Sequence, residues 1–137
     1  MTDKPLEGRT ALVTGASRGI GAASAIALDL TEADSVSRLA SAIGGRWDTL
    51  EILMISAAYL PELTPISQID PKQFNQAMMT IVVATQALLA NFDPLLRRSK
   101  QGRVLGLTSS VGASPRPFWG AYASTKAAFD NLLLTYG

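Results

Sequence analysis

The sequence contains no cysteine and no histidine among its 137 residues. The chain therefore cannot form a disulfide, a cysteine nucleophile, a Ser-His-Asp triad or a zinc site built from the usual ligands. Any acid–base chemistry near neutral pH must use tyrosine, lysine or carboxylates whose pKa values are shifted from their ordinary range.

Strong net charge and long hydrophobic runs are also missing. The 12 basic and 11 acidic residues give a net charge of +1, so no strong field directs the protein toward nucleic acid or an anionic membrane. The amino-terminal MTDKPLEGR is polar and unlike a secretory signal, and no run of about 18 uninterrupted apolar residues occurs. We expect a soluble, cytoplasmic protein that contacts neither nucleic acid nor a membrane.

Short apolar runs alternate with longer helical patterns along the chain. The runs at 9–15, 49–58 and 102–110 predict strands. One helical pattern begins at Gly19. A second follows Thr31, the expected cap, and ends at Gly44–Gly45, and a third occupies 121–136. Another extends from Asp70 and Pro71 to Arg98, with Pro94 expected to bend or interrupt its last turns. This alternation predicts one α/β domain with a Rossmann-like parallel sheet.

A glycine-rich segment, TGASRGIG at 14–21, directly follows the first predicted strand and opens a helix. Glycines allow the tight turn and the close approach of a pyrophosphate, and the free amides of a helix start favour an anion. The bland alternative is a turn that only links strand to helix, but its position favours a dinucleotide site. The residues expected at this site are Gly15, Ser17, Arg18, Gly19, Ile20 and Gly21.

A second constellation opens the last helical pattern, where Tyr122 and Lys126 in YASTK lie on one helical face. A nearby ammonium favours a phenolate, so Lys126 is expected to lower the pKa of Tyr122. Ser109 follows the third predicted strand and is expected to reach the carboxyl edge of the sheet. Its hydroxyl could hold a substrate oxygen beside Tyr122.

These motifs resemble the short-chain dehydrogenase/reductase family: TGASRGIG its glycine-rich turn, YASTK its YxxxK motif, and TSSVG the stretch with its serine. The resemblance implies hydride transfer between a nicotinamide and a small carbonyl or alcohol. Tyr122 would be the acid–base group, Lys126 would tune it and hold the ribose, and Ser109 would orient the substrate oxygen. Ser110 is the alternative for the serine, because Ser109 is chosen only on its spacing to Gly112.

The resemblance also implies further cofactor contacts. A basic residue at the position of Arg18 is associated in the family with the 2′-phosphate, which favours NADP(H) over NAD(H). Asp29 and Leu30 match the family's pair beside the adenine, and Ala57 lies in the stretch after the fourth family strand. For Asp29, a plain charge at a helix or loop end is the equal alternative.

The sequence departs from the family pattern in length and at two positions. Family chains reach roughly 250 residues, and the segment after the glycine-rich turn, with a join near Leu28 or earlier, and a carboxyl-terminal part are missing here. Ser56 and Val82 stand where the family carries asparagines. An impaired pseudoenzyme that binds nucleotides or oligomerises is therefore the alternative function, and a nucleic-acid-binding module is weaker still.

Two further interpretations concern apolar residues. By the resemblance, the helices at 71–98 and 121–136 are expected to pair with their copies in a homodimer or homotetramer. The segment from Pro115 to Trp119 lies between Ser109 and Tyr122, where Phe118 or Trp119 could form an apolar wall. A packing role is favoured for both aromatic rings.

Overall fold

The computed structural model describes residues 5–15, 29–32 and 34–137. The predicted helix that begins at Gly19 lies outside these residues. The elements are β1 (Ala11–Thr14), α1 (Ser35–Gly44), β2 (Ile52–Ile55), η2 (Ile66–Gln68), α2 (Pro71–Ala77), η3 (Met78–Val83), α3 (Ala84–Arg98), β3 (Arg103–Gly106), η4 (Ser110–Gly112) and α4 (Gly120–Tyr136).

The strands form a parallel three-stranded sheet in the order β1-β2-β3. Ala11 pairs with Ile52, and Ile52 pairs with Arg103 on its other side. The predicted parallel α/β fold is thus confirmed, although each strand is shorter than its apolar run. β1 and β3 are edge strands in the described part of the chain. Leu105 of β3 is 52% exposed because its side chain alternates with that of Val104 and lies on the face opposite the core.

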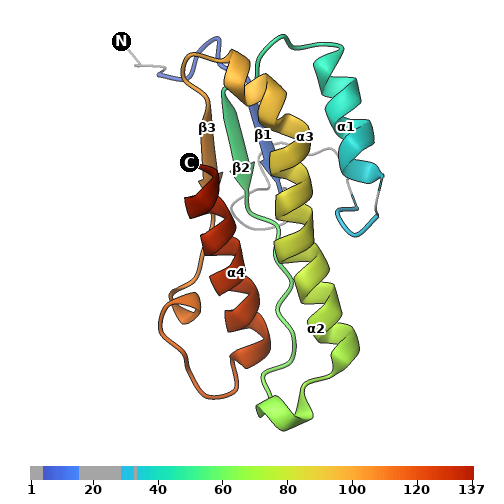
Figure 1. Cartoon of the computed structure of the whole chain (residues 1–137), viewed down its shortest axis with the longest axis vertical. Helices are drawn as coiled ribbons and strands as arrows, with labels where there is room; N and C mark the ends of the chain where they lie inside the picture. The colour runs from blue at the N-terminus through green and yellow to red at the C-terminus, as the bar shows by residue number, and fades with distance from the viewer. Residues whose placement is uncertain (1–4, 16–28, 33) are drawn as a thin grey trace.

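One face of the sheet carries the core. Leu53 of β2 and Phe92 of α3 are fully buried in one apolar cluster, and Val36 of α1 and Phe129 of α4 join it. The described helices α1, α3 and α4 therefore pack on the same side of the strands (Figure 1). α4 begins beyond the carboxyl ends of the strands and returns along the sheet, so its first turns lie beside η4 (Figure 1).

The long helix begins as predicted. The side chain of Asp70 accepts a hydrogen bond from the backbone N–H of Lys72, and Pro71 occupies the first turn. The helix then continues through α2, η3 and α3 to Arg98. Pro94 lies inside α3 and does not interrupt it. The π-helical register of η3 was not predicted.

This helix is the element closest to a membrane span by composition. Over Pro71–Arg98, 28 residues, the most apolar window has a mean hydropathy of 1.4, and 44% of that window is buried inside the protein. Length and composition alone would allow it to cross a bilayer. Core helices of globular proteins share these properties, so the finding is weak support for a span.

The start of α1 differs from the prediction. Asp34, not Thr31, is the N-cap residue, and its side chain makes no capping hydrogen bond. Thr31 is engaged elsewhere, because its backbone N–H and its hydroxyl both donate to Asp29 Oδ1, at 2.9 and 2.6 Å. The helix ends at Gly44 with Gly45 as its C-cap, as expected.

Candidate active site

Ser109 lies where the chain leaves β3 and turns into η4. Its backbone is extended, with φ −141° and ψ 142°, and its carbonyl accepts a hydrogen bond from the N–H of Gly112. Gly112 brings this turn against α4: a Cβ there would lie 3.1 Å from the backbone nitrogen of Ala127. Glycine thus permits the close approach that sets Ser109 beside the helix of Tyr122 and Lys126.

Lys126 is the most deeply buried charged group of this region. Only 3% of the residue is exposed, and its Nζ donates a 2.8 Å hydrogen bond to the carbonyl oxygen of Leu107, two residues before Ser109. Nζ also lies 4.5 Å from the ring centroid of Phe129 and 5.9 Å from that of Tyr122. The structure therefore joins the Tyr–Lys helix to the segment that carries the serine.

Burial shifts the pKa of each of these two groups in the direction that favours the neutral side chain. Burial lowers the pKa of Lys126, and the negative charge of Asp130 raises it in opposition. Burial raises the pKa of Tyr122. The expectation that Lys126 lowers the pKa of Tyr122 is wrong for the protein alone, because burial dominates and the ammonium is directed at Leu107.

One of the two predicted aromatic wall residues, Trp119, lies beside Tyr122. The rings of Trp119 and Tyr122 have centroids 6.0 Å apart and are tilted by 60°. Phe118 is 56% exposed and has a positive φ of 71°, an uncommon conformation for a bulky residue. The favoured packing role is thus not met by Phe118, whose ring is largely exposed. No described residue makes a hydrogen bond to the hydroxyl of Tyr122 or of Ser109, so both can serve another molecule.

The start of the glycine-rich turn is held against the strand beside it. Gly15 has a φ of +69°, and a Cβ on it would lie 2.6 Å from the backbone nitrogen of Ala57. Ser56 secures this contact: its hydroxyl donates to the carbonyl of Thr14, and its N–H donates to Thr14 Oγ1. Ser17, Arg18, Gly19, Ile20 and Gly21 lie outside the described residues.

Two other predicted cofactor residues lie before α1. The pKa of Asp29 is lowered by the hydrogen bonds from Thr31, and this carboxylate is exposed. Leu30 packs against the apolar core, which accounts for a hydrophobic residue at this point. Contact of either residue with an adenine stays a prediction.

Val82 lies in η3, which packs against α4. Its side chain is half-buried against the apolar core, as its interpretation as an ordinary core-facing residue predicted. Valine cannot hydrogen-bond, so a proton relay through this position has no side-chain support. π-Helical turns within α-helices often accompany functional sites, and this one faces the Tyr–Lys helix.

Sequence reasoning missed two polar residues of this region. Thr108 donates a short hydrogen bond from its hydroxyl to Asp130 Oδ1, which connects the residue before Ser109 to α4. The signal that could have identified Asp130 is its spacing, four residues beyond Lys126 on the same helical face.

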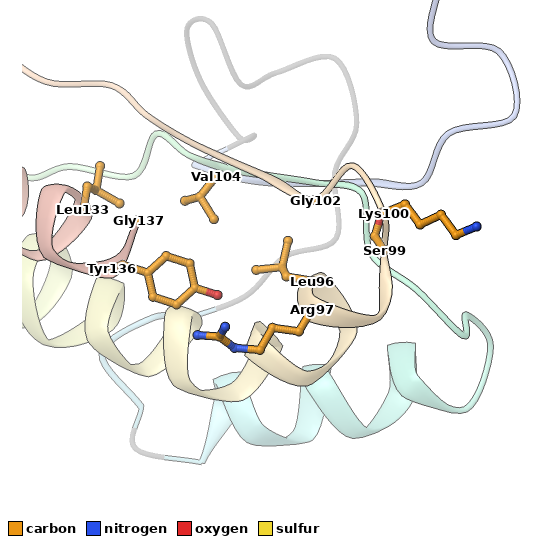
Figure 2. A pocket seen from close by; sticks show the side chains of 9 residues that line it. All are labelled: Leu96, Arg97, Ser99, Lys100, Gly102, Val104, Leu133, Tyr136 and Gly137. Carbon is orange, nitrogen blue, oxygen red and sulfur yellow. The ribbon is translucent and has the colours of Figure 1, made fainter.

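A separate cavity lies at the other end of α4. It has a volume of about 380 Å³ and none of the predicted site residues lines it (Figure 2). Beside it the hydroxyl of Tyr136 donates to Asp93 Oδ1 at 2.8 Å, and Arg97 Nε donates to both oxygens of Asp93. This network connects the ends of α3 and α4 and is remote from Ser109 and Tyr122.

The family model for short chain dehydrogenases matches residues 22–136. The chain belongs to the short-chain dehydrogenase family. A sorbitol dehydrogenase from Cereibacter sphaeroides is 28% identical to this chain over 166 residues, with 96% of this chain and 64% of that protein covered. Because 166 aligned positions exceed the 137 residues present, the alignment opens gaps in this chain, as a shortened form requires.

Solved structures give the same fold. A protein described as a short chain dehydrogenase from Shigella flexneri 2a superposes with a TM-score of 0.89 at 27% identity, covering 95% of this chain and 75% of that one. Another from Escherichia coli CFT073, complexed with NADPH, gives 0.75 at 32% identity, covering 79% and 46%. This chain spans 64% of the length of the sorbitol dehydrogenase that it matches.

Proposed function

We propose that this chain forms the cofactor-binding and catalytic part of an NADP(H)-dependent oxidoreductase that acts on a small carbonyl or alcohol. The observation that carries the proposal is the connection of Lys126 Nζ to the Leu107 carbonyl, at 2.8 Å, directly before the serine segment and within 5.9 Å of the Tyr122 ring. Lys126 is 3% exposed, and no described residue hydrogen-bonds to the nearby hydroxyls of Ser109 and Tyr122, which supports a chemical role for the three residues.

The residues present fit a dinucleotide. Gly15, with its positive φ and no Cβ, lets the chain at the carboxyl end of β1 turn more closely against Ala57 than another residue could, as a dinucleotide-binding turn requires. Lys126 has three donor hydrogens and uses one on Leu107, so others can hold ribose hydroxyls. The preference for NADP(H) rests on Arg18 and on the NADPH complex of the Escherichia coli relative.

When bound, the nicotinamide supplies or accepts the hydride. In the reductive direction, the Tyr122 hydroxyl donates its proton to the substrate oxygen, and in the reverse direction it takes that proton back. Ser109 donates a hydrogen bond that orients the same oxygen. Burial raises the pKa of Tyr122 above its ordinary value of about 10, so the hydroxyl carries a proton to donate at neutral pH.

The first experiment follows nicotinamide fluorescence while the chain is titrated with NADPH and with NADH, and then measures turnover on a panel of ketones and alcohols. We expect tighter binding of NADPH. Absence of binding for both cofactors would contradict the proposal.

Substitution of Tyr122 tests the proton donor. Tyr122→Phe should lower kcat by about 100-fold or more, the usual contribution of general acid catalysis, while the Kd of NADPH stays unchanged. Tyr136→Phe is the matched control, because it makes the same change at the other end of α4 and should leave kcat unaltered. Unchanged turnover in Tyr122→Phe would remove Tyr122 from the mechanism.

A nucleotide-binding pseudoenzyme is the second candidate. Val82 favours it, because an apolar side chain in η3 cannot relay a proton toward the Tyr–Lys helix. Cofactor binding without turnover on the whole panel would favour this second function.

We expect a cytoplasmic protein that binds no nucleic acid and pairs with its own copies through the helix 71–98 and α4. The buried face of α3 is already used by the core, since Leu88, Phe92 and Leu96 are buried there. A contact between copies must therefore use exposed apolar residues, such as Val83 of η3, which is 45% exposed, and Leu134 of α4, which is 84% exposed.

A further inference from the structure

Two consecutive residues at the exit of β3 are attached to two positions one turn apart on α4. The carbonyl of Leu107 accepts a hydrogen bond from Lys126 Nζ at 2.8 Å. The hydroxyl of the next residue, Thr108, donates a short hydrogen bond to Asp130 Oδ1. The following residue is Ser109. The position of the serine relative to α4 thus depends on a two-point attachment, of which Asp130 is one point.

Asp130 also differs from Lys126 in its surroundings. Lys126 is 3% exposed and lies against the ring of Phe129, whereas Asp130 is half-exposed one turn further along the same face. A buried ammonium is disfavoured by desolvation, and a neighbouring carboxylate offsets that cost. Burial lowers the pKa of Lys126, and the charge of Asp130 raises it.

Among the ionisable groups on the described elements around Lys126, Asp130 is the one whose charge shifts the pKa of Lys126. In the part of the chain that the structure describes, η3 and η4 contain none. Asp93 and Arg97 are engaged with Tyr136 at the far end of α4. The ionisable residues of α2, α3, β3 and α4 are Lys72, Asp93, Arg97, Arg98, Arg103, Tyr122, Lys126, Asp130 and Tyr136.

We propose that Asp130 is a positioning residue of the Ser109–Tyr122–Lys126 site: it fixes Thr108, and with it Ser109, against α4, and it supplies the counter-charge for the buried ammonium of Lys126. The inference rests on the proposed function for its catalytic meaning. The hydrogen bond between Thr108 and Asp130 and the effect of the Asp130 charge on Lys126 can both be measured on the protein without any substrate.

Two substitutions separate the hydrogen bond between Thr108 and Asp130 from the negative charge of Asp130. Asp130→Asn removes the charge but keeps an oxygen that can accept the hydrogen bond of Thr108. Thr108→Val removes the hydrogen bond but keeps the carboxylate. The pKa of Lys126 is followed by NMR of its side chain in the cofactor-free chain. We expect Asp130→Asn to lower this pKa and Thr108→Val to leave it near the wild-type value.

The effect of the Thr108–Asp130 hydrogen bond on Ser109 is measured in the same samples. Thr108→Val should shift the backbone amide signal of Ser109 more than Asp130→Asn does, and it should lower kcat about tenfold with an unchanged KM for NADPH, because orientation is lost rather than cofactor binding. In Asp130→Asn, the alkaline limb of the kcat/KM profile should move to lower pH.

Asp93→Asn is the matched control, because this carboxylate binds Tyr136 and Arg97 and should leave the pKa of Lys126 unaltered. If Asp130→Asn leaves the pKa of Lys126 unchanged, Asp130 is not the counter-charge of Lys126. If Thr108→Val retains both the Ser109 signal and full kcat, the hydrogen bond between Thr108 and Asp130 does not position Ser109. An inactive wild-type chain would contradict the proposed function, while the NMR titration would still decide on Asp130.

Discussion

Burial acts in opposite directions on the two ionisable groups that would perform the chemistry. It raises the pKa of Tyr122 and lowers that of Lys126, so both are pushed toward the neutral form. The spacing in YASTK predicted that the two side chains share a face, and they do lie within reach of each other. It could not predict the pKa of Tyr122, because that depends on how much solvent the folded core removes.

At the residue scale, Gly15 offers a test with a natural control. Gly15 and Gly8 both have a positive φ, at +69° and +80°, but a Cβ meets the backbone of Ala57 only at Gly15. Gly8→Ala should cost about 1 kcal/mol of unfolding free energy through strain alone. Gly15→Ala should cost about 1–3 kcal/mol more through the clash, and it should weaken NADPH binding.

The measurement is urea unfolding of both variants beside the wild type. Equal losses for the two variants would mean that the sheet gives way at Ala57, and that the close approach at Gly15 is not required.

At the scale of elements, the sequence predicted where the long helix begins, but it did not predict the π-helical hydrogen bonding inside that helix. Asp70 and Pro71 predicted the start of the long helix because a cap and a first-turn proline act within a few residues. The π-helical turn of η3 escaped prediction, because apolar spacing of three and four residues does not distinguish α from π hydrogen bonding. The cap of α1 was misplaced, since Thr31 binds Asp29 instead.

Val82→Asn in η3 tests whether the missing amide limits turnover. The new side chain gives the π-helical turn a polar group beside α4, and kcat should rise severalfold if proton transfer is limiting. Burying an amide beside the core should lower the unfolding free energy by about 1–3 kcal/mol.

Val83→Asn is the control for Val82→Asn, because Val83 is the next residue of η3 but is 45% exposed, so its substitution should change neither quantity much. Steady-state turnover and urea unfolding of both variants decide the matter. A Val82→Asn protein with unaltered kcat would remove the relay as a limit.

The hydrogen bond between Tyr136 of α4 and Asp93 of α3 predicts how stability depends on pH. Burial and the hydrogen bond to Asp93 raise the pKa of Tyr136 to about 12, against about 10 in an unfolded chain. Between these values the folded chain holds more protons than the unfolded one, so the unfolding free energy falls as pH rises. Below pH 10 the stabilisation is fully present.

Tyr136→Phe should therefore flatten the loss of stability between about pH 10 and 12. Thermal or urea unfolding at several alkaline pH values measures the slope, and the difference from wild type isolates Tyr136 from other titrating groups. An identical alkaline slope in both proteins would show that the tyrosine titrates normally.

At the scale of the whole molecule, the parallel fold and the family were predictable, because strand–helix alternation and three motifs are written in short stretches of sequence. The Thr108–Asp130 and Tyr136–Asp93 contacts were not, since their partners lie 22 and 43 residues apart and only the packing of α4 brings them together. Leu105 is exposed because it lies on the face of the sheet opposite the core, which a continuous run of apolar residues does not reveal.

The outer side of the helices gives the last prediction. Leu134 of α4 is 84% exposed, and a stable interface between copies needs about 800 Å² of surface from each partner. If the copies pair there, Leu134→Glu places an unpaired charge in the contact and should weaken the dimer about 100-fold or more. Sedimentation over a range of concentrations measures the change. Leu6→Glu, at a residue that is 62% exposed before β1, should leave association unaltered, and a dimer that survives Leu134→Glu would exclude α4 from the interface.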